Sequence, residues 1–413
     1  MKISEKRISS GLWAYLFFFI ALEPAYFQHI KITDRIFVLM QIAMFGCMVI
    51  LRCLPYFRMT KIRRTGECKE PSRIVLLLFV YYSWLLAVTI FNGGRTSSIL
   101  WQAIQFCGFV LYLDTVLKNN PSALFKNGLN LLSFYLVLNC CAVFLIPHGL
   151  YATSYFTSNY FFGYRNQNIN FILPALVLVV LKDICYRKCK LQIVVLYTVA
   201  FLTAIKVWSA ATLIVLSFMS IVVLCYMVCG KNKFIAMHIF TDKIFNFFTL
   251  LAINIVCFFG LVFLRLQFYF EYFITVVLKK KLTLSGRTTL WDRTMEFIKK
   301  NPILGYGKEV YTERAVKFGY SSNMPQGLHA HNRFLETIYS GGVILLGLYL
   351  YMLVYAAFCL KRIKKTNFAK ILSFGIFVYM IGMLTELYDY CIFFWGMLVI
   401  AENAEGILNK LNG

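Results

Sequence analysis

The chain has 413 residues, of which 60% are hydrophobic and 17% are aromatic. Soluble domains contain about 45–50% apolar residues, so this composition excludes an ordinary soluble protein. A net charge of +24 would suggest a nucleic-acid ligand in a soluble protein, but membrane topology explains most of it here, and we expect no nucleic-acid partner.

Twelve apolar segments, each near the roughly 20-residue length that crosses a bilayer, follow one another along the chain. They predict an all-α polytopic membrane protein whose single transmembrane domain covers residues 1–413. The alternation of polar and apolar residues over about 10 positions that marks the strands of a membrane β-barrel is not seen. Glu23 and Pro24 interrupt the first segment. The predicted spans are 12–28, 34–54, 73–91, 97–117, 128–147, 168–185, 191–206, 209–229, 244–265, 332–360, 368–386 and 389–406.

The distribution of Lys and Arg predicts the orientation of these spans. If the N-terminus is cytoplasmic, 25 of the 42 Lys and Arg residues lie in inner segments and 5 lie in short outer loops. Cytoplasmic loops carry the excess of positive charge, so we expect both termini to be cytoplasmic. The other 12 lie in the segment from Arg265 to Arg333, both residues included, which contains the predicted long loop, residues 266–331, that this topology places outside. Anionic lipid headgroups or an anionic substrate would explain them.

A polar cluster, Tyr164 to Asn168, precedes the span predicted at 168–185. Amide and guanidinium groups at a helix N-terminus suit sugar or phosphate binding, which makes Arg165 and Asn168 candidate substrate-binding residues. Helix capping by Asn166 or Asn168 explains the same pattern equally well.

The long loop contains a predicted amphipathic helix over residues 287–300, because its apolar residues recur at spacings of three and four. Ser285 can cap the start of this helix, and Asn301-Pro302 ends it. A second short helix is predicted over 309–318. The guanidinium groups of Arg287 and Arg293 can bind phosphate oxygens, and Arg287 lies where the helix N-terminus also favours an anion. Snorkelling beside lipid headgroups is the alternative for both.

His331 and Asn332 lie where the long loop returns to apolar sequence. A His can be neutral near pH 7 and can accept a proton from a sugar hydroxyl. Asn332 can bind substrate or cap the following helix. His329 and His331 alone do not complete a usual metal site, since no Asp, Glu or third His is adjacent to them, and we predict no metal.

Acidic residues at predicted span ends are few, and two of them lie on the outer side. Glu386 and Asp389 are therefore the acids that could join a site formed by the long loop. Interfacial side chains without a catalytic role are the alternative.

Taken together, these segments resemble the O-antigen ligase and polymerase family. The resemblance covers roughly residues 160–345 and includes the order and spacing of the motifs. About twelve spans with one large extracytoplasmic loop late in the chain are also typical of that family. The matching motifs are Gly163 to Asn168, Ser285-Gly286-Arg287, Leu290-Trp291, Asn301-Pro302-Ile303-Leu304-Gly305-Tyr306-Gly307, and His331-Asn332-Arg333-Phe334-Leu335 followed by Gly342.

The resemblance implies a metal-independent glycosyltransferase without a cofactor, embedded in the bacterial cytoplasmic membrane. Its donor would be an oligosaccharide on undecaprenyl pyrophosphate at the outer face. An acceptor hydroxyl would attack the anomeric carbon with inversion while the lipid pyrophosphate leaves. His331 would then be the base or would position the acceptor, and Arg287, with Arg165 and Arg293, would stabilise the pyrophosphate. Membrane lipids and a chain-length regulator protein are the expected partners.

Polymerase and ligase differ near the start of the span predicted at 209–229. Ligases commonly have a Ser-Arg pair there, whereas this chain has Trp208-Ser209-Ala210-Ala211-Thr212, with Lys206 as the nearest cation that could replace the Arg. The sequence therefore favours a polymerase of capsule, O-antigen or exopolysaccharide over a ligase. A transporter of lipid-linked sugars is a third possibility, disfavoured because flippases usually carry charged residues within their spans.

Overall fold

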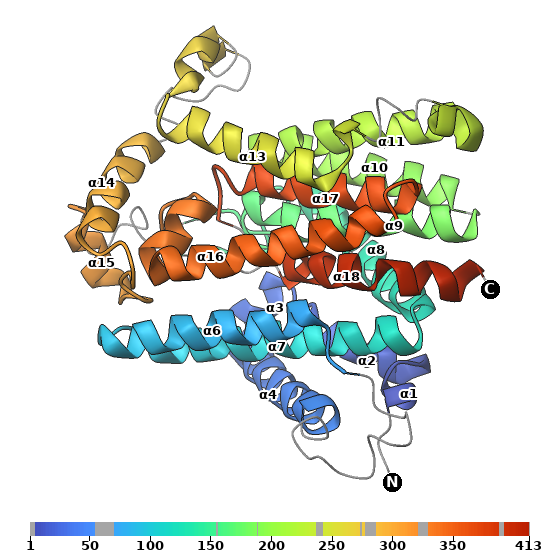
Figure 1. Ribbon diagram of the computed structural model, residues 1–413, viewed down its shortest axis with the longest axis horizontal. Coiled ribbons are helices and arrows are strands. Elements are labelled where there is room, and N and C mark those ends of the chain that lie inside the picture. The colour runs from blue at the N-terminus through green and yellow to red at the C-terminus, as the bar shows by residue number, and fades with distance from the viewer. Residues whose placement is uncertain are drawn as a thin grey trace.

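The protein, seen in a computed structural model, is a helical bundle. The structure describes residues 5–53, 70–153, 156–187, 189–236, 243–272, 275–276, 286–320, 329–387 and 392–412. Over these ranges the regular elements are helices, and the β-structure is limited to isolated bridges between residues 151 and 163. Most of the long helices run side by side, and two short helices cover one end of the bundle (Figure 1). The predicted all-α polytopic fold is confirmed.

Each of the twelve predicted spans overlaps a helix in the described part of the chain. Seven segments are long and apolar enough to cross a membrane: Lys31–Arg52, Arg73–Phe91, Thr96–Asn119, Leu124–Leu145, Arg165–Tyr186, Ala210–Met227 and Arg333–Arg362. The helices at the predicted spans are α2 (Gly11–Ala21), α4 (Lys31–Met48), α6 (Arg73–Phe91), α7 (Thr96–Asn119), α8 (Leu129–Leu145), α9 (Ile169–Tyr186), α10 (Lys190–Lys206), α11 (Ala210–Ala236), α13 (Phe247–Val262), α16 (Arg333–Arg362), α17 (Asn367–Gly382) and α18 (Ile392–Asn412).

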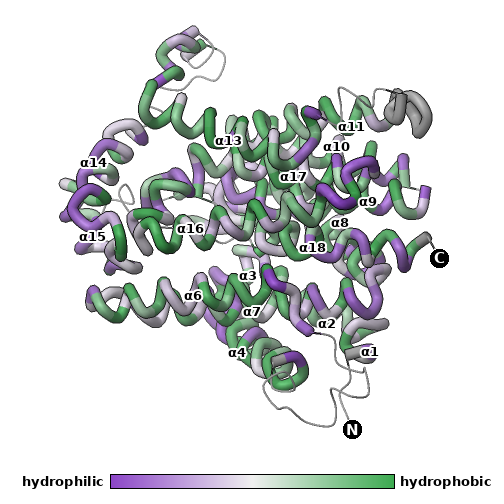
Figure 2. Tube along the Cα trace, viewed as in Figure 1, coloured by the Kyte–Doolittle hydropathy of each residue, from purple (hydrophilic) through white to green (hydrophobic). Residues whose placement is uncertain are grey.

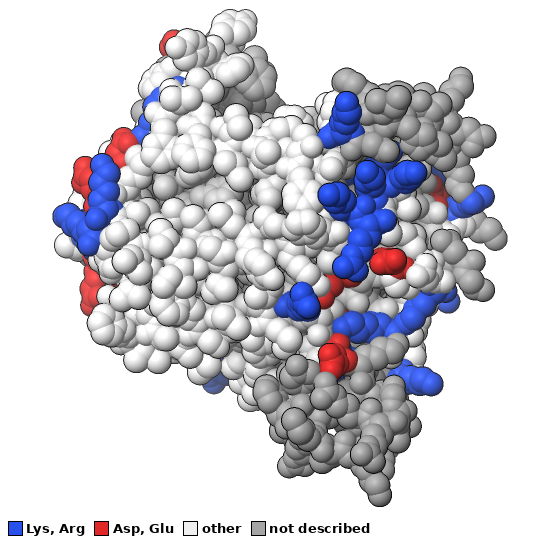
Figure 3. Space-filling model, viewed as in Figure 1, with Lys and Arg blue, Asp and Glu red and all other residues white. Residues whose placement is uncertain are grey.

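Hydropathy along these helices fits a bilayer. Apolar residues dominate the middle of the bundle, and polar residues concentrate toward its two ends (Figure 2). On the visible surface, Lys and Arg gather at the end that carries the C-terminus and again at the opposite end, with an almost uncharged band between them (Figure 3). Such a band is the surface that a lipid hydrocarbon core requires.

The first predicted span is broken rather than continuous. Helix α2 ends at Ala21, and a separate helix, α3 (Ala25–His29), follows it. Pro24 causes the break, because it has no N–H to donate to a preceding carbonyl and adopts an extended conformation at φ −69° and ψ 150°. The break places the Glu23 side chain inside the bundle, where the Gln41 amide donates a hydrogen bond to it over 3.3 Å.

The span predicted at 332–360 contains a kink that the sequence did not predict. Gly341 and Gly342 leave helical geometry within α16, and the backbone of residues 302–307 packs into the break. The N–H of Tyr306 donates to the carbonyl of Tyr339 over 2.8 Å, and the N–H of residue 343 donates to the carbonyl of residue 302 over 2.9 Å. A Cβ on Gly342 would lie 1.7 Å from the carbonyl oxygen of Ile303, so the contact requires glycine.

The long loop forms α14 (Arg287–Lys300) and α15 (Tyr311–Lys317), close to the predicted helices at 287–300 and 309–318. Residues Leu290, Phe318 and Tyr339 form a small hydrophobic core that fastens both helices to α16. Arg314 also makes two hydrogen bonds of 2.7 Å to the Glu336 carboxylate. The loop is therefore a packed cap on α16. Ser285, the predicted cap of α14, lies outside the described residues.

Candidate active site

Glu386 is the point where four distant segments of the chain meet. It lies just beyond the end of α17, and its Oε1 forms an ion pair with Arg287, the first residue of α14. The same oxygen accepts a hydrogen bond of 2.9 Å from the amide of Asn166. Its other oxygen, Oε2, lies 3.3 Å from Nδ1 of His331. The fold thus brings the two predicted catalytic residues, Arg287 and His331, to one carboxylate.

The backbone around His331 is held in an uncommon conformation. His331 has φ 49°, a left-handed geometry that non-glycine residues adopt only where their surroundings impose it. The next residue, Asn332, is held by two hydrogen bonds. Its side chain accepts one from the N–H of Leu335 over 3.1 Å and donates one to the carbonyl of Leu384 over 2.9 Å. It caps α16 and ties it to the segment that carries Glu386. The capping role considered for Asn332 is therefore present in the structure.

Burial and charge act in opposite directions on Glu386, which is 9% exposed. Burial alone would raise the pKa of this carboxyl, but the hydrogen bond with His331 and the positive charge of Arg287 outweigh burial and lower the pKa to about 2. Glu386 is consequently an anion at neutral pH, available to hold a cation or a polarised N–H group.

His329 forms a hydrogen bond with the backbone of the nearby His331. Its burial, reinforced by the proximity of His331, holds the His329 pKa well below its usual value. A neutral imidazole can accept a hydrogen bond, and Nδ1 of His329 accepts one of 3.3 Å from the backbone N–H of His331. The two rings lie 4.0 Å apart between centroids. His329 therefore helps to position the residue that faces Glu386.

Arg293, a predicted pyrophosphate ligand, faces a different way from Arg287. Six residues separate them, which corresponds to about 120° around a helix. The Arg293 guanidinium donates to the carbonyl of Phe318 and lies 5.3 Å from the ring centre of Tyr320. In this structure Arg293 fastens the end of α15 to α14.

The polar cluster before α9 forms a single turn of 3₁₀ helix, η4 (Arg165–Asn168). Asn168 is fully buried and bonded within the fold, accepting from Asn139 over 3.1 Å and donating to the carbonyl of Arg165 over 3.0 Å. The Arg165 guanidinium donates to the hydroxyl of Tyr164 over 2.9 Å. Of this cluster, Asn166 is the member that contacts Glu386.

Lys206, the proposed replacement for the ligase Arg, is exposed at the end of α10 and lies 5.7 Å from the ring centre of Phe144. Among the described residues, no hydrogen bond or ion pair connects Lys206, Arg165 or Arg293 to Glu386. Ser209, three residues after Lys206, does reach the site, since its hydroxyl donates to the Asn166 side chain over 3.2 Å.

Two residues at the centre of the site, Glu386 and Asn166, were not predicted as catalytic or substrate-binding residues. The sequence singled out Glu386 as an acid able to join the long loop, but nothing in the sequence indicated that it would bind both Arg287 and His331. Asn166 lies between the candidates Arg165 and Asn168, and nothing in the sequence indicated that it, and not they, would contact Glu386. Asp389, the second outer acid, lies outside the described residues.

A metal ion would need several adjacent ligands. In the part of the chain that the structure describes, no three His, Cys, Asp or Glu side chains are grouped in a way that could hold one.

A protein-family model described as O-antigen ligase matches residues 196–350. The chain carries an O-antigen ligase family domain. This match confirms the resemblance over these residues. At the level of the family it supports a function of the O-antigen ligase and polymerase type, with a lipid-linked glycan as the class of substrate. No curated protein and no solved structure matches the chain. Arg287 and His331 lie within the O-antigen ligase match, whereas Asn166 and Glu386 lie on either side of it and complete the site through the fold.

Proposed function

We propose that this protein is a polysaccharide polymerase. It joins oligosaccharide repeat units carried on undecaprenyl pyrophosphate, at the outer face of the bacterial cytoplasmic membrane, by metal-independent inverting glycosyl transfer. Both termini are cytoplasmic and residues 266–331 face outside in this proposal. The observation that supports it most is the Glu386 carboxylate, which holds a potential proton acceptor, His331, beside a potential pyrophosphate ligand, Arg287.

The His331–Glu386 pair suits removal of a proton from an acceptor hydroxyl. When Nδ1–H of His331 donates to the carboxylate, the lone pair of the neutral ring is on Nε2, which can accept the hydroxyl proton. The negative charge of Glu386 then stabilises the imidazolium that forms. Because Asn332 and His329 fix the backbone around His331, the ring is held in place for this step.

Arg287 suits the leaving group. As the acceptor oxygen bonds to the anomeric carbon, the bond from that carbon to the pyrophosphate oxygen breaks, and the pyrophosphate takes the electron pair. A guanidinium has five N–H donors, so Arg287 can keep its bond to Glu386 and direct others to phosphate oxygens. Its position at the N-terminus of α14 adds the backbone N–H groups of the first turn. Charge that develops on the leaving oxygen is therefore stabilised where it forms.

A ligase on the same scaffold is the second candidate. Polymerase is favoured because the segment that carries Arg in ligases here supplies Ser209, which is hydrogen-bonded to Asn166, and because Lys206 contacts Phe144 instead of the Glu386 cluster. A ligase would leave long polymer unattached to its acceptor when the gene is deleted, whereas a polymerase would leave single repeat units.

The test replaces His331 by Ala and measures glycan length in cells. We expect the variant to reach the membrane at the wild-type level and to produce only single repeat units. His148→Ala is the matched control, because His148 is exposed in the loop after α8 and should leave chain length unchanged. Polymer of wild-type length from His331→Ala would refute the proposed role of this residue. Repeat units that accumulate on the inner leaflet after gene deletion would instead indicate a transporter.

A further inference from the structure

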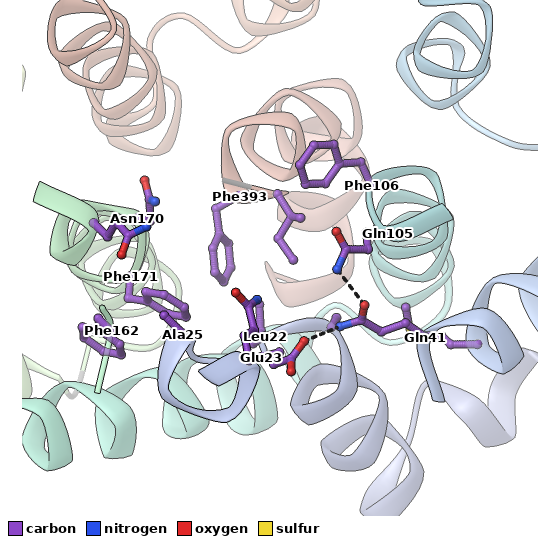
Figure 4. Close-up of a pocket in the computed structure, with 15 residues that line it drawn as sticks. Leu22, Glu23, Ala25, Gln41, Gln105, Phe106, Phe162, Asn170, Phe171 and Phe393 are labelled. Atoms are coloured by element: carbon purple, nitrogen blue, oxygen red, sulfur yellow. Dashed lines mark hydrogen bonds between the residues drawn. The ribbon is translucent and has the colours of Figure 1, made fainter. Parts of the chain in front are cut away.

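A second polar region lies close to the Glu386 cluster and has no role in the chemistry proposed above. It is a cavity of about 410 Å³, within the size range of small-molecule sites. Segments from the N-terminal helices and from α7 line one part of it, and segments of α9 and α18 line the rest (Figure 4). Its lining consists of Ala21, Leu22, Glu23, Ala25, Gln28, Gln41, Met44, Gln105, Phe106, Phe162, Gln167, Asn170, Phe171, Ile392 and Phe393.

One wall of the cavity is a chain of hydrogen-bonded polar side chains. Nε2 of Gln105 donates to Oε1 of Gln41 over 2.8 Å, and Nε2 of Gln41 donates to Oε2 of Glu23 over 3.3 Å (Figure 4). The Glu23 carboxyl is 9% exposed, and its Oε1 is buried without a hydrogen-bond partner among the described residues. Buried polar atoms are usually satisfied by protein groups or by bound molecules, so this oxygen is an acceptor that a hydroxyl group in the cavity could use.

Aromatic rings and further amides complete the lining. Phe162 and Phe171 stack with their centroids 4.3 Å apart, and Asn170 lies on the side of the cavity opposite Gln105 (Figure 4). Among the described residues, the lining contains no Lys, Arg or His. Amides and a carboxyl exchange hydrogen bonds with hydroxyl groups, and aromatic faces pack against the C–H face of a sugar ring. The combination suits an uncharged polyol and is unfavourable for pyrophosphate.

The cavity and the Glu386 cluster share one short segment of chain. Asn166 donates to Glu386, and the next residue, Gln167, together with Asn170, lines the cavity. The hydroxyl of Tyr379 in α17, the helix that leads to Glu386, donates to Asn170 over 3.3 Å. A sugar in the cavity would thus contact the segment that also carries Asn166, the residue that donates to Glu386.

We propose that this cavity binds the acceptor sugar, the residue whose hydroxyl attacks the donor. The inference rests on the proposed glycosyl transfer and assigns its second substrate. In an inverting displacement the nucleophile and the leaving group lie on opposite faces of the anomeric carbon. The cationic Arg287 suits the leaving pyrophosphate, and the cation-free cavity suits the sugar that carries the nucleophile.

The test uses the full-length protein in lipid nanodiscs and a lipid-free probe. The probe is the oligosaccharide released by mild acid from the lipid-linked sugars of a strain that lacks this gene. Gln105→Ala and Asn170→Ala remove one hydrogen-bonding group from each wall, and we expect each to weaken probe binding about tenfold, the effect of one hydrogen bond of ordinary net strength. Gln192→Ala is the matched control, because Gln192 lies near the start of α10, is not among the lining residues and accepts a hydrogen bond from Lys182.

Three further measurements make the result decisive. Each variant should bind undecaprenyl pyrophosphate as the wild type does, which shows that it is folded. The KM for the acceptor should rise about tenfold in Gln105→Ala and Asn170→Ala with little change in kcat. Inorganic pyrophosphate should not displace the oligosaccharide. Wild-type affinity in both variants, or displacement by pyrophosphate, would overturn the assignment of the cavity.

The same measurements separate this inference from the proposed chemistry. His331→Ala should abolish transfer and leave probe binding unchanged. If His331→Ala transfers normally, the proposed catalytic role fails, and the binding data for Gln105→Ala and Asn170→Ala still decide what the cavity holds. If transfer needs His331 but both cavity variants keep the wild-type acceptor KM, the proposed function stands and the acceptor site lies elsewhere.

Discussion

Replacing Glu386 by Gln should impair both the catalysis and the stability of this protein. The change keeps the shape of the side chain and removes its charge. The hydrogen bond with His331 and the charge of Arg287 hold the pKa of Glu386 at about 2 against the usual 4.5. Since each tenfold change in proton affinity is worth about 1.4 kcal/mol, this difference favours the anion by roughly 3–4 kcal/mol. Because the carboxyl is 9% exposed, solvent screening reduces this value little. We expect Glu386→Gln to lower the free energy of unfolding at neutral pH by up to about 3–4 kcal/mol.

The catalytic effect follows from the tautomer of His331. A Gln amide can donate an N–H to Nδ1, which places the ring proton on Nε2 and removes the lone pair that would accept the hydroxyl proton. Loss of a general base costs about 10²- to 10⁴-fold in rate, so kcat should fall by that factor. The assay is the initial rate of polymerisation of purified lipid-linked repeat units by protein in nanodiscs, with thermal unfolding measured on the same samples.

The dependence on pH gives a second signature of the same charge. A carboxyl whose folded pKa is depressed stabilises the protein above its unfolded pKa, and this contribution is lost as the pH falls from about 4.5 toward about 2. The wild type should therefore lose its advantage over Glu386→Gln in that acidic window. Glu296→Gln, an exposed acid on α14, should behave as the wild type throughout. A Glu386→Gln protein with kcat within about threefold of the wild type would refute the base-positioning role assigned to Glu386.

Three further predictions test the fold around the site. Gly342→Ala should lower the free energy of unfolding by about 3 kcal/mol or more, since it combines a glycine-only conformation with a clash against the Ile303 carbonyl. A lower yield and melting temperature would show this loss, and wild-type stability would contradict the tight packing of the turn. Arg314→Ala leaves Glu336 buried without its ion-pair partner, which costs about 3–5 kcal/mol, and should expose α15 to protease; an unchanged digestion pattern would argue against this anchor. Asn166→Ala removes one hydrogen bond to Glu386 and should lower kcat/KM about tenfold, whereas wild-type kinetics would remove Asn166 from the site.

Hydropathy predicted the helices well because an apolar helix pairs its backbone polar groups within itself and can therefore cross a bilayer. The break at Pro24 was also signalled, since proline cannot continue the hydrogen-bond ladder. The kink at Gly341 and Gly342 was not predicted. A glycine pair within an apolar run is compatible with a straight helix, and the reason for this pair lies in the turn at 302–307, which contacts it only in the folded chain.

The sequence predicted individual residues of the candidate site but not the contacts between them. Arg287 and His331 were identified by residue type and position, but their shared contact with Glu386 depends on how α14, α16 and α17 pack. Asn332 could be read as a cap or as a ligand, and the structure places it as a cap with a bond to Leu384. Both roles fit the sequence because a side-chain amide can form hydrogen bonds with a helix end or with a sugar. The tertiary contacts decide which partner it has.

The turn inserted into α16 limits how relatives of this protein could exchange parts. Backbone hydrogen bonds join Tyr306 to Tyr339 and Gly307 to Ser340, so residues 302–307 supply donors to carbonyls that the break leaves unpaired. A chimera that takes the extracytoplasmic loop from one relative and the following helix from another must keep both halves of this contact. Segments 302–307 and 339–343 must therefore come from the same parent protein. Chimeras whose junctions lie outside these two segments are the ones expected to fold.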